Sequence, residues 1–118
     1  MEPHKLEGKA KMLLIHIDDD DMWEGEPLYK AIVKKLRELD LAGATGYRGL
    51  LGYGAKNRVH HQGFLGFSNL PIMISVIDTE EKIRGALPVL AEMISEGLLA
   101  MTDVEVIKYT SGKARKSK

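Results

Sequence analysis

The chain has 118 residues, of which 44% are hydrophobic and 29% charged, and its formal net charge is zero. This length predicts one domain with a core of its own. The neutral balance implies no general attraction to nucleic acid or to an acidic membrane. Because the sequence contains no cysteine, disulfides, thiol catalysis and thiolate metal sites are excluded. Apolar stretches long enough for a membrane span or a signal peptide are missing, so we expect a cytoplasmic protein that is not membrane-embedded.

The first half of the chain predicts a strand, a helix and a second strand. Met12–Ile17 is an apolar run that indicates a buried strand. Pro27 then opens a helix, because the missing N–H of proline costs nothing at a first helical position. Apolar residues recur at helical spacing until Gly43, where we expect a left-handed C-cap. Ala44–Leu51 is typical of a strand interrupted by glycine.

The second half predicts a strand, a helix and a last strand. Pro71–Ile77 is apolar and β-branched, as in a buried strand. Asp78 has a glutamate three residues later, a capping-box spacing that predicts Asp78 as the N-cap of the second helix. Pro88 predicts either a kink in that helix or a late start. The helix is expected to end at Gly97, and Val104–Tyr109 to form the last strand.

The order β-α-β-β-α-β predicts an α+β, ferredoxin-like sandwich, in which a four-stranded antiparallel sheet carries both helices on one face. The first and third strands are apolar on both faces, which favours oligomerisation through the open face of the sheet. We expect a flexible N-terminus at 1–10, a single domain at 11–110 with a long loop at about 53–69, and a flexible basic tail at 111–118.

The segment from Gly43 to Gly66 has an unusual composition. It holds seven of the twelve glycines, and no Asp or Glu occurs between Asp40 and Asp78. Backbone N–H groups of a glycine turn can form an anion-binding nest, and basic side chains can add charge-assisted hydrogen bonds. The alternative is a flexible connection whose turns need positive φ. The candidate ligand-binding residues in this segment are Arg48, Gly52, Tyr53, Gly54, Lys56 and Arg58.

Two further groups could bind a metal. His60 and His61 could ligate a metal or titrate near neutral pH, although adjacent loop histidines are more often solvated. Asp18–Asp21 offers hard oxygen ligands, but a solvated turn before a helix is the commoner arrangement. We therefore predict no metal site, with His60 and His61 as the candidates should one exist. No nucleophile–base pair can be assembled, so the sequence does not favour an enzyme.

Several motifs resemble known families. The nitrogen-regulatory PII signalling proteins have stretches similar to Ala42–Thr45, Gly52–Gly54 and Val106–Gly112. A PII-related family, "domain of unknown function 190", is similar over nearly the whole chain, from Leu13 to Tyr109. The stretches that carry this second resemblance are Pro27–Val33, Ala42–Gly49, Asp78–Ile83 and Asp103–Tyr109.

The resemblance implies a homotrimer with clefts between subunits that bind an adenine nucleotide. Gly52–Gly54 would be the glycine turn at the base of the long loop, Thr45 a ligand-contacting threonine, and Lys108 a phosphate-contacting residue on the last strand. A second phosphate loop would fall at Ser95–Thr102, where only Gly97 matches. The resemblance therefore implies a smaller or differently held nucleotide than a triphosphate.

The leading hypothesis is a PII-like regulatory protein without a required cofactor. A small-molecule effector, an adenine nucleotide or similar anion, would bind between subunits. The loop would then signal to a protein partner, a transporter or an enzyme. The alternative hypothesis is a metal-binding or purely structural trimer related to copper-tolerance proteins.

Overall fold

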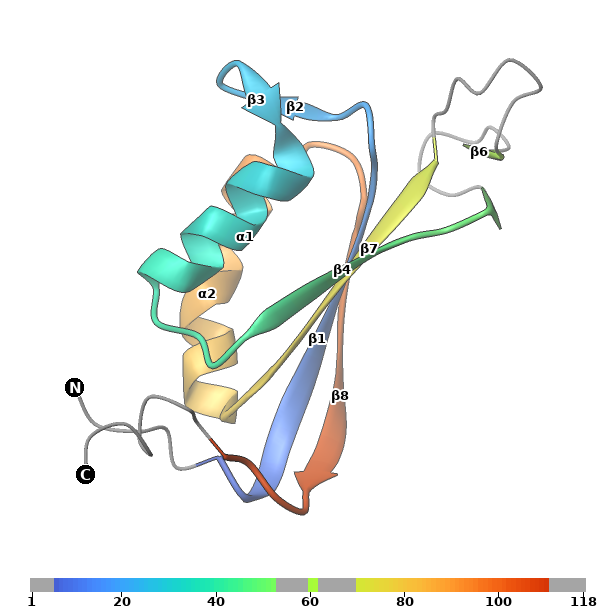
Figure 1. Cartoon of the computed structure of the whole chain (residues 1–118). Helices are drawn as coiled ribbons and strands as arrows, with labels where there is room; N and C mark the ends of the chain where they lie inside the picture. The colour runs from blue at the N-terminus through green and yellow to red at the C-terminus, as the bar shows by residue number, and fades with distance from the viewer. Residues whose placement is uncertain (1–5, 53–59, 62–69, 111–118) are drawn as a thin grey trace.

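The computed structural model describes residues 6–52, 60–61 and 70–110 and has two helices on one side of a sheet (Figure 1). The elements in chain order are β1 (Gly8–Asp18), β2 (Met22–Trp23), β3 (Glu26–Pro27), α1 (Leu28–Glu38), β4 (Ala44–Arg48), β5 (Leu51–Gly52), β6 (His60–His61), β7 (Pro71–Asp78), α2 (Glu80–Met93) and β8 (Leu98–Val106).

The main sheet has the order β4-β7-β1-β8, and every neighbouring pair is antiparallel. Four long strands and two helices in the order β1-α1-β4-β7-α2-β8 make the predicted ferredoxin-like α+β sandwich, which confirms the predicted fold class. Two short pairs, β2 with β3 and β5 with β6, are added to it. β5 lies just before the segment expected to be a long loop, and its partner β6 lies within that segment.

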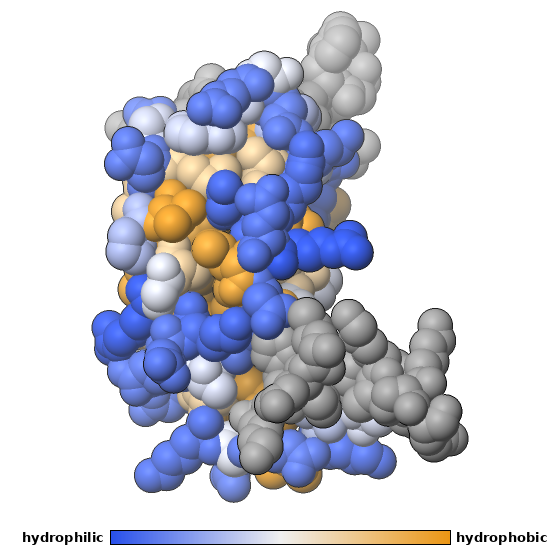
Figure 2. Space-filling model, turned by 90° about the vertical axis from the view of Figure 1, so that its left-hand side faces the viewer, coloured by the Kyte–Doolittle hydropathy of each residue, from blue (hydrophilic) through white to orange (hydrophobic). Residues whose placement is uncertain are grey.

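The core lies between the helices and one face of the sheet. Since side chains alternate across a strand, every second residue faces the helices and is buried from Leu13 to Ile17 in β1 and from Ile72 to Asp78 in β7. Burying each of these large aliphatic side chains contributes roughly 1.5–3 kcal/mol. The most completely buried side chains are Leu13, Ile15, Ile32, Leu36, Ile74, Val76, Ile83 and Leu90. On the helix-covered side, some apolar surface stays exposed among hydrophilic residues (Figure 2).

Two strands are longer than predicted, because they pair with each other. β1 and β8 are paired from Gly8 opposite Val106 to His16 opposite Leu98. The ladder therefore draws residues 8–10, expected in a flexible N-terminus, into the sheet. It also starts β8 at Leu98 rather than at Val104, and ends it three residues before Tyr109.

α1 ends earlier than predicted. Asp40, not Gly43, takes the left-handed conformation, with φ of +64°. The Asp40 N–H donates to the Arg37 carbonyl at 3.0 Å, and the Leu41 N–H donates to the Leu36 carbonyl at 3.1 Å. These two bonds form a Schellman motif, and the two buried leucines supply its hydrophobic contact. An Asp in place of the usual Gly hid this stop from sequence patterns.

α2 begins at a different cap from the predicted one. Thr79 is the N-cap, and its hydroxyl accepts a hydrogen bond from the Lys82 N–H at 3.3 Å. The helix then runs without a late start through Pro88, which is solvent-exposed, and ends at Met93 with Ile94 as C-cap. In the described part of the chain, neither helix has the length and hydropathy that crossing a bilayer requires.

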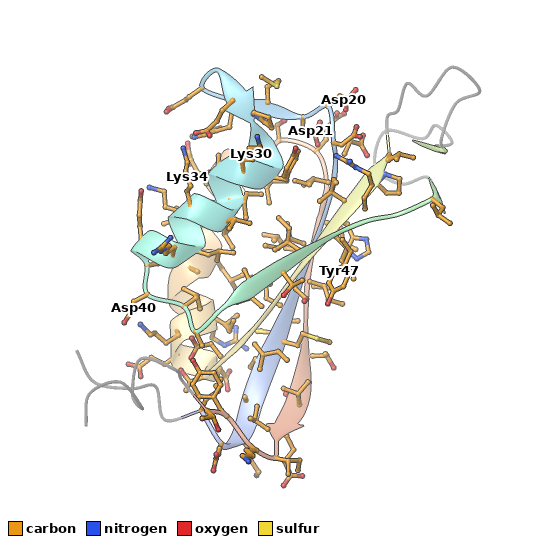
Figure 3. The ribbon with its side chains drawn as sticks, in the orientation of Figure 1. Asp20, Asp21, Lys30, Lys34, Asp40 and Tyr47 are labelled. Carbon is orange, nitrogen blue, oxygen red and sulfur yellow. The ribbon has the colours of Figure 1, made fainter. Side chains whose placement is uncertain are left out.

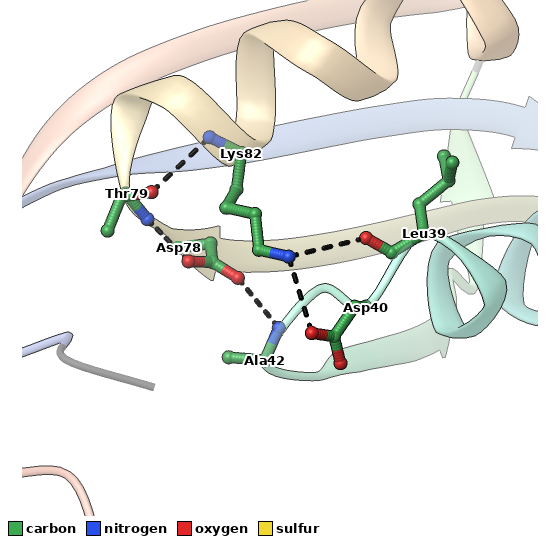
Figure 4. Close-up of polar contacts among 6 residues, drawn as sticks. All are labelled: Leu39, Asp40, Ala42, Asp78, Thr79 and Lys82. Atoms are coloured by element: carbon green, nitrogen blue, oxygen red, sulfur yellow. Dashed lines mark hydrogen bonds and ion pairs between the residues drawn. The ribbon is translucent and has the colours of Figure 1, made fainter. Parts of the chain in front are cut away.

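Asp78, the predicted cap, is instead a buried anchor (Figure 4). It is the last residue of β7. Because side chains alternate along the strand, its side chain lies on the same helix-covered face as Ile74 and Val76, where it is 0% exposed. Its carboxylate accepts hydrogen bonds from the N–H groups of Ala42, at 2.7 Å, and Thr79, at 2.6 Å. Beside it, the Lys82 ammonium lies 3.5 Å from both the Leu39 carbonyl and the Asp40 carboxylate. The chain before β4 is thereby joined to the start of α2.

We predict that Asp78→Ala lowers the free energy of unfolding by about 2–4 kcal/mol, because it leaves backbone N–H groups without their charged acceptor. Asp78→Asn keeps one acceptor oxygen and should lose less. Glu105→Ala is the control, since Glu105 is exposed on β8 and its loss should cost under about 0.5 kcal/mol. Urea denaturation at one protein concentration measures all three. Equal stability of Asp78→Ala and wild type would refute the anchor.

An exposed ion-pair network lies near the start of β1, where Lys11 pairs with Asp78 in the sheet. The Lys11 ammonium donates to the Asp103 carboxylate and lies 4.0 Å from Glu80, which also accepts from Arg84 at 2.6 Å. The hydrogen bond from Lys11 lowers the pKa of Asp103, and the one from Arg84 lowers the pKa of Glu80. The hydrogen bond to Asp103 raises the pKa of Lys11.

These shifts predict how Lys11→Gln changes stability with pH. Carboxylates with lowered folded-state pKa values stabilise the fold above their ordinary values, 3.8 for Asp103 and 4.5 for Glu80, and this contribution is lost as pH falls through the folded values. Lys11 contributes below its ordinary pKa of 10.5, and its contribution is lost as pH rises through the higher folded value. The stability difference between wild type and Lys11→Gln should therefore persist at neutral pH and shrink in acid and with added salt. A difference independent of pH would contradict this.

Candidate functional site

The candidate site lies at the end of the sheet where β4 leads into β5. The last residues of β1 and the first residues of β7 lie beside it. Asp19, just after β1, fastens this end of the sheet. Its N–H donates to the Leu70 carbonyl at 3.0 Å, and its carboxylate accepts from the Leu70 N–H at 3.2 Å and lies 3.7 Å from Arg48 Nε. The Gly49 N–H donates to the Pro71 carbonyl at 2.7 Å. A Cβ on Gly49 would lie 2.8 Å from Pro71 Cγ, so this close approach needs glycine.

Thr45 lies on the helix-free face of the sheet, which we call the open face. It pairs with Ser75, which pairs in turn with Leu14 of β1. Two residues along β4, Tyr47 points to the same face, and its neighbour Met73 pairs with His16 (Figure 3). Tyr47 is 50% exposed. The surface therefore combines an aromatic ring, two hydroxyl groups and an imidazole, which suits an aromatic ligand with polar substituents.

Tyr47 was not among the predicted site residues. The signal that could have identified it is its spacing of two from Thr45 in a predicted strand, since residues i and i+2 share a face. Arg48 was predicted to join Thr45, but the strand period separates them. Arg48 belongs to the helix-covered face, where it lies 3.7 Å from Asp19. The structure thus does not bring these two predicted residues to one face.

Lys108 is at the opposite end of the molecule. It follows the last residue of β8 instead of lying within that strand, and it is exposed. Val106 pairs with Gly8 at one end of β1, whereas Arg48 is joined through Ile72 to Ile17 at the other. At a rise of about 3.3 Å per residue, these ends are roughly 30 Å apart. Thr45 is joined through Ser75 to Leu14, six residues along β1 from Gly8, so roughly 20 Å of strand separates Thr45 from the end that carries Lys108. One chain therefore does not bring Lys108 to Thr45.

The predicted glycine turn lies only partly within the described residues. Gly52 is in β5, where it pairs with His60, while Leu51 pairs with His61. The backbone of the two histidines is thus placed beside the start of the turn. Tyr53, Gly54, Lys56 and Arg58, and the rest of the predicted loop, lie outside the described residues.

The predicted second phosphate loop at residues 95–102 is largely strand. Leu98 onward belongs to β8, which leaves a short connection after α2. Gly97 is the one residue of this segment that matches the phosphate loop, and local packing explains why it is glycine. A Cβ at this position would lie 2.6 Å from the His16 carbonyl oxygen. Its φ of +156° also favours glycine. Gly97 thus serves the packing of this connection against β1.

The aspartates at the end of β1 and just after it form the acidic cluster that the sequence indicated. The carboxylate oxygens of Asp18, Asp20 and Asp21 lie within 4.8 Å of one another, and Asp21 also accepts a hydrogen bond from the Asp18 N–H at 3.0 Å. Oxygen ligands of this kind suit Mg²⁺ or Ca²⁺. The hydrogen bond to Asp18 equally fits the predicted solvated turn.

Comparison with known proteins gives consistent matches. A UPF0166 protein of Methanocaldococcus jannaschii is 42% identical over 101 residues, which covers 85% of this chain and 94% of that protein. A UPF0166 protein of Aquifex aeolicus is 38% identical over 100 residues, covering 84% and 94%. The fold is similar to the structure of CPII bound to ADP and bicarbonate, from Thiomonas intermedia K12. The TM-score is 0.56 at 20% sequence identity, covering 85% of this chain and 90% of that one.

The family model DUF190, described as "Uncharacterized ACR, COG1993", matches residues 10–106. This match spans β4, β7, β8, both helices and all of β1 except its first two residues, and so covers the four strands that build the open face. The resemblance expected from the sequence motifs is confirmed. The chain belongs to the DUF190 family.

Proposed function

We propose that this protein is a PII-like regulator whose homotrimer binds an adenine nucleotide in clefts between subunits. The loop at residues 53–69 would transmit the bound state to a partner protein, a transporter or an enzyme. The observation that carries the proposal is the open face, where Thr45 and Tyr47 adjoin the start of that loop. The likeness of the fold to a protein whose structure contains ADP supports the choice of ligand.

The open face is apolar enough to need a cover. Tyr47, Ile77 and Leu98 on this face are 50%, 37% and 52% exposed, and Met12, Leu14 and Met73 lie among them. Contiguous apolar surface of this kind marks an interaction site. Copies of the same chain are the simplest cover, because a face built from strands can pack against its own symmetry mates.

Charge argues for a site shared between subunits. Among the described residues, the open-face positions of the four strands carry neither lysine nor arginine. Nucleotide phosphates would therefore need cations from elsewhere. Lys108 of a second subunit could reach Thr45 in an oligomer, although roughly 20 Å of strand separates the two positions within one chain. The loop residues Lys56 and Arg58 could add to it.

Ile77→Glu should break the assembly. A carboxylate in an apolar interface is costly to desolvate, so the mutant should be mainly monomeric where wild type has about three times the mass of the 13.1 kDa chain. Val33→Glu is the matched control, because Val33 is 38% exposed, against 37% for Ile77, but lies on α1. Light scattering coupled to size exclusion measures both. A monomeric wild type would remove the clefts and with them the proposal.

Thr45→Val should weaken binding of the preferred adenine nucleotide by about tenfold, through loss of one hydrogen bond. Calorimetry with ATP, ADP and AMP establishes the preference on wild type. Thr102→Val is the control, because it makes the same change on the open face of β8. Absence of binding by all three nucleotides would refute nucleotide sensing. Stoichiometric metal in purified protein, lost in a His60→Ala/His61→Ala double mutant, would instead favour the metal-binding alternative.

A further inference from the structure

A groove of about 730 Å³ lies on the side of the sheet opposite the candidate nucleotide site. It runs between α1 and the edge strand β4, with Ile72 and Ile74 of β7 also lining it. Its volume is in the range of pockets that take small organic ligands. The groove uses the helix-covered face of β4, so its existence does not rest on nucleotide binding or on trimer formation.

The groove exists because Gly46 has no side chain. Gly46 pairs with Ile74, and a Cβ built on it would point toward Ile74, with Cγ1 of that residue 4.0 Å away as its nearest contact. A side chain would therefore fit here, and neither backbone strain nor close packing requires glycine. Glycine within a strand weakens the sheet and often marks a place where a ligand approaches the backbone.

The walls of the groove are mainly apolar. Ile72 and Ile74 are almost completely buried, at 5% and 0% exposure. Val33 and Tyr29 line the groove from α1, and Val33 is 38% exposed even though it is a large aliphatic residue. An apolar or aromatic ligand body would cover this surface, a favourable burial of roughly 25 cal/mol per Å².

The rim of the groove carries a surplus cation. Lys34 is paired with Glu26 at 3.0 Å, and Arg48 lies 3.7 Å from Asp19. Lys30 also lines the groove, on the same helix as Lys34 (Figure 3). Within the described residues Lys30 has no ion-pair or hydrogen-bond partner. One unpaired ammonium beside an apolar wall complements a single negative charge on an apolar body.

We infer that this groove is a second ligand site, which binds a small organic acid with an aromatic or branched apolar body and one carboxylate. The body would lie on Val33, Ile72 and the backbone of Gly46, and the carboxylate would accept a hydrogen bond from the Lys30 ammonium. A monoanion matches the charge better than a phosphate monoester does, because the other two cations of the rim already face carboxylates.

The test uses 3-phenylpropionate as the probe and the full-length protein, followed by amide NMR. Binding should shift the resonances of residues 30–34 and 46–48, and the neutral amide of the probe should bind at least about tenfold more weakly. Lys30→Gln should weaken binding of the acid by about tenfold, whereas Arg37→Gln, an equal charge change elsewhere on α1, should not.

Filling the groove tests its position. Gly46→Leu should abolish binding and Gly46→Ala should weaken it, whereas Gly43→Leu, where a Cβ meets nothing within 4 Å, should leave it unchanged. A Gly46→Leu variant that keeps wild-type affinity would overturn the inference, and so would shifts confined to the open face. Equal affinity for the neutral amide would overturn the assignment of an anion. Lys30→Gln changes no packed residue and should fold even if Gly46→Leu does not. Its affinity for the acid therefore tests the site independently, and wild-type affinity in this variant would overturn the role of Lys30.

Discussion

The arrangement of this molecule depends on one buried carboxylate. Asp78 ends the central strand β7 and accepts hydrogen bonds from Ala42, before β4, and from Thr79, the cap of α2. Because an unpaired buried charge would be costly, the carboxylate forces the connection after α1 to lie against the start of α2. This fixes where the edge strand β4 begins, and the period of two then decides the face of every residue that follows.

β4 therefore presents different chemistry on its two faces. Thr45 and Tyr47 join the open face with Ser75, Met73 and His16, whereas Gly46 and Arg48 face α1. The open face is apolar and short of cations, which favours a ligand held between subunits. The opposite face has an unfilled volume and Lys30, which has no ion-pair partner among the described residues, and this combination favours an amphipathic acid. A shift of β4 by one residue against β7 would exchange the side chains of its two faces. Because the Schellman motif at Asp40 and the Asp78 anchor fix where β4 begins, both sites depend on them.

The order of the long elements, the antiparallel sheet and the family were predictable, because apolar periodicity and several specific motifs carry that information. The ends of elements were less so. Asp40 replaces glycine at a left-handed position, and Asp78 has the spacing of a cap but the burial of a core residue. The early start of β8 depends on pairing with β1, a contact between distant segments. For the same reason, the separation of Thr45 from Lys108 follows only from the strand register. The separation of Thr45 from Arg48, in contrast, follows from the strand period within β4 itself.

Mixing two mutant subunits distinguishes a binding site that takes residues from two chains from a site built within one chain. The Thr45→Val and Lys108→Gln variants are purified separately and then refolded together, and nucleotide binding is measured by calorimetry. Each mutant alone should bind weakly. Mixed assemblies should regain sites of wild-type affinity, because an intact Thr45 of one chain would then meet an intact Lys108 of its neighbour. If mixing restores no such site, or if Lys108→Gln binds as wild type does, the account of an intersubunit site is wrong.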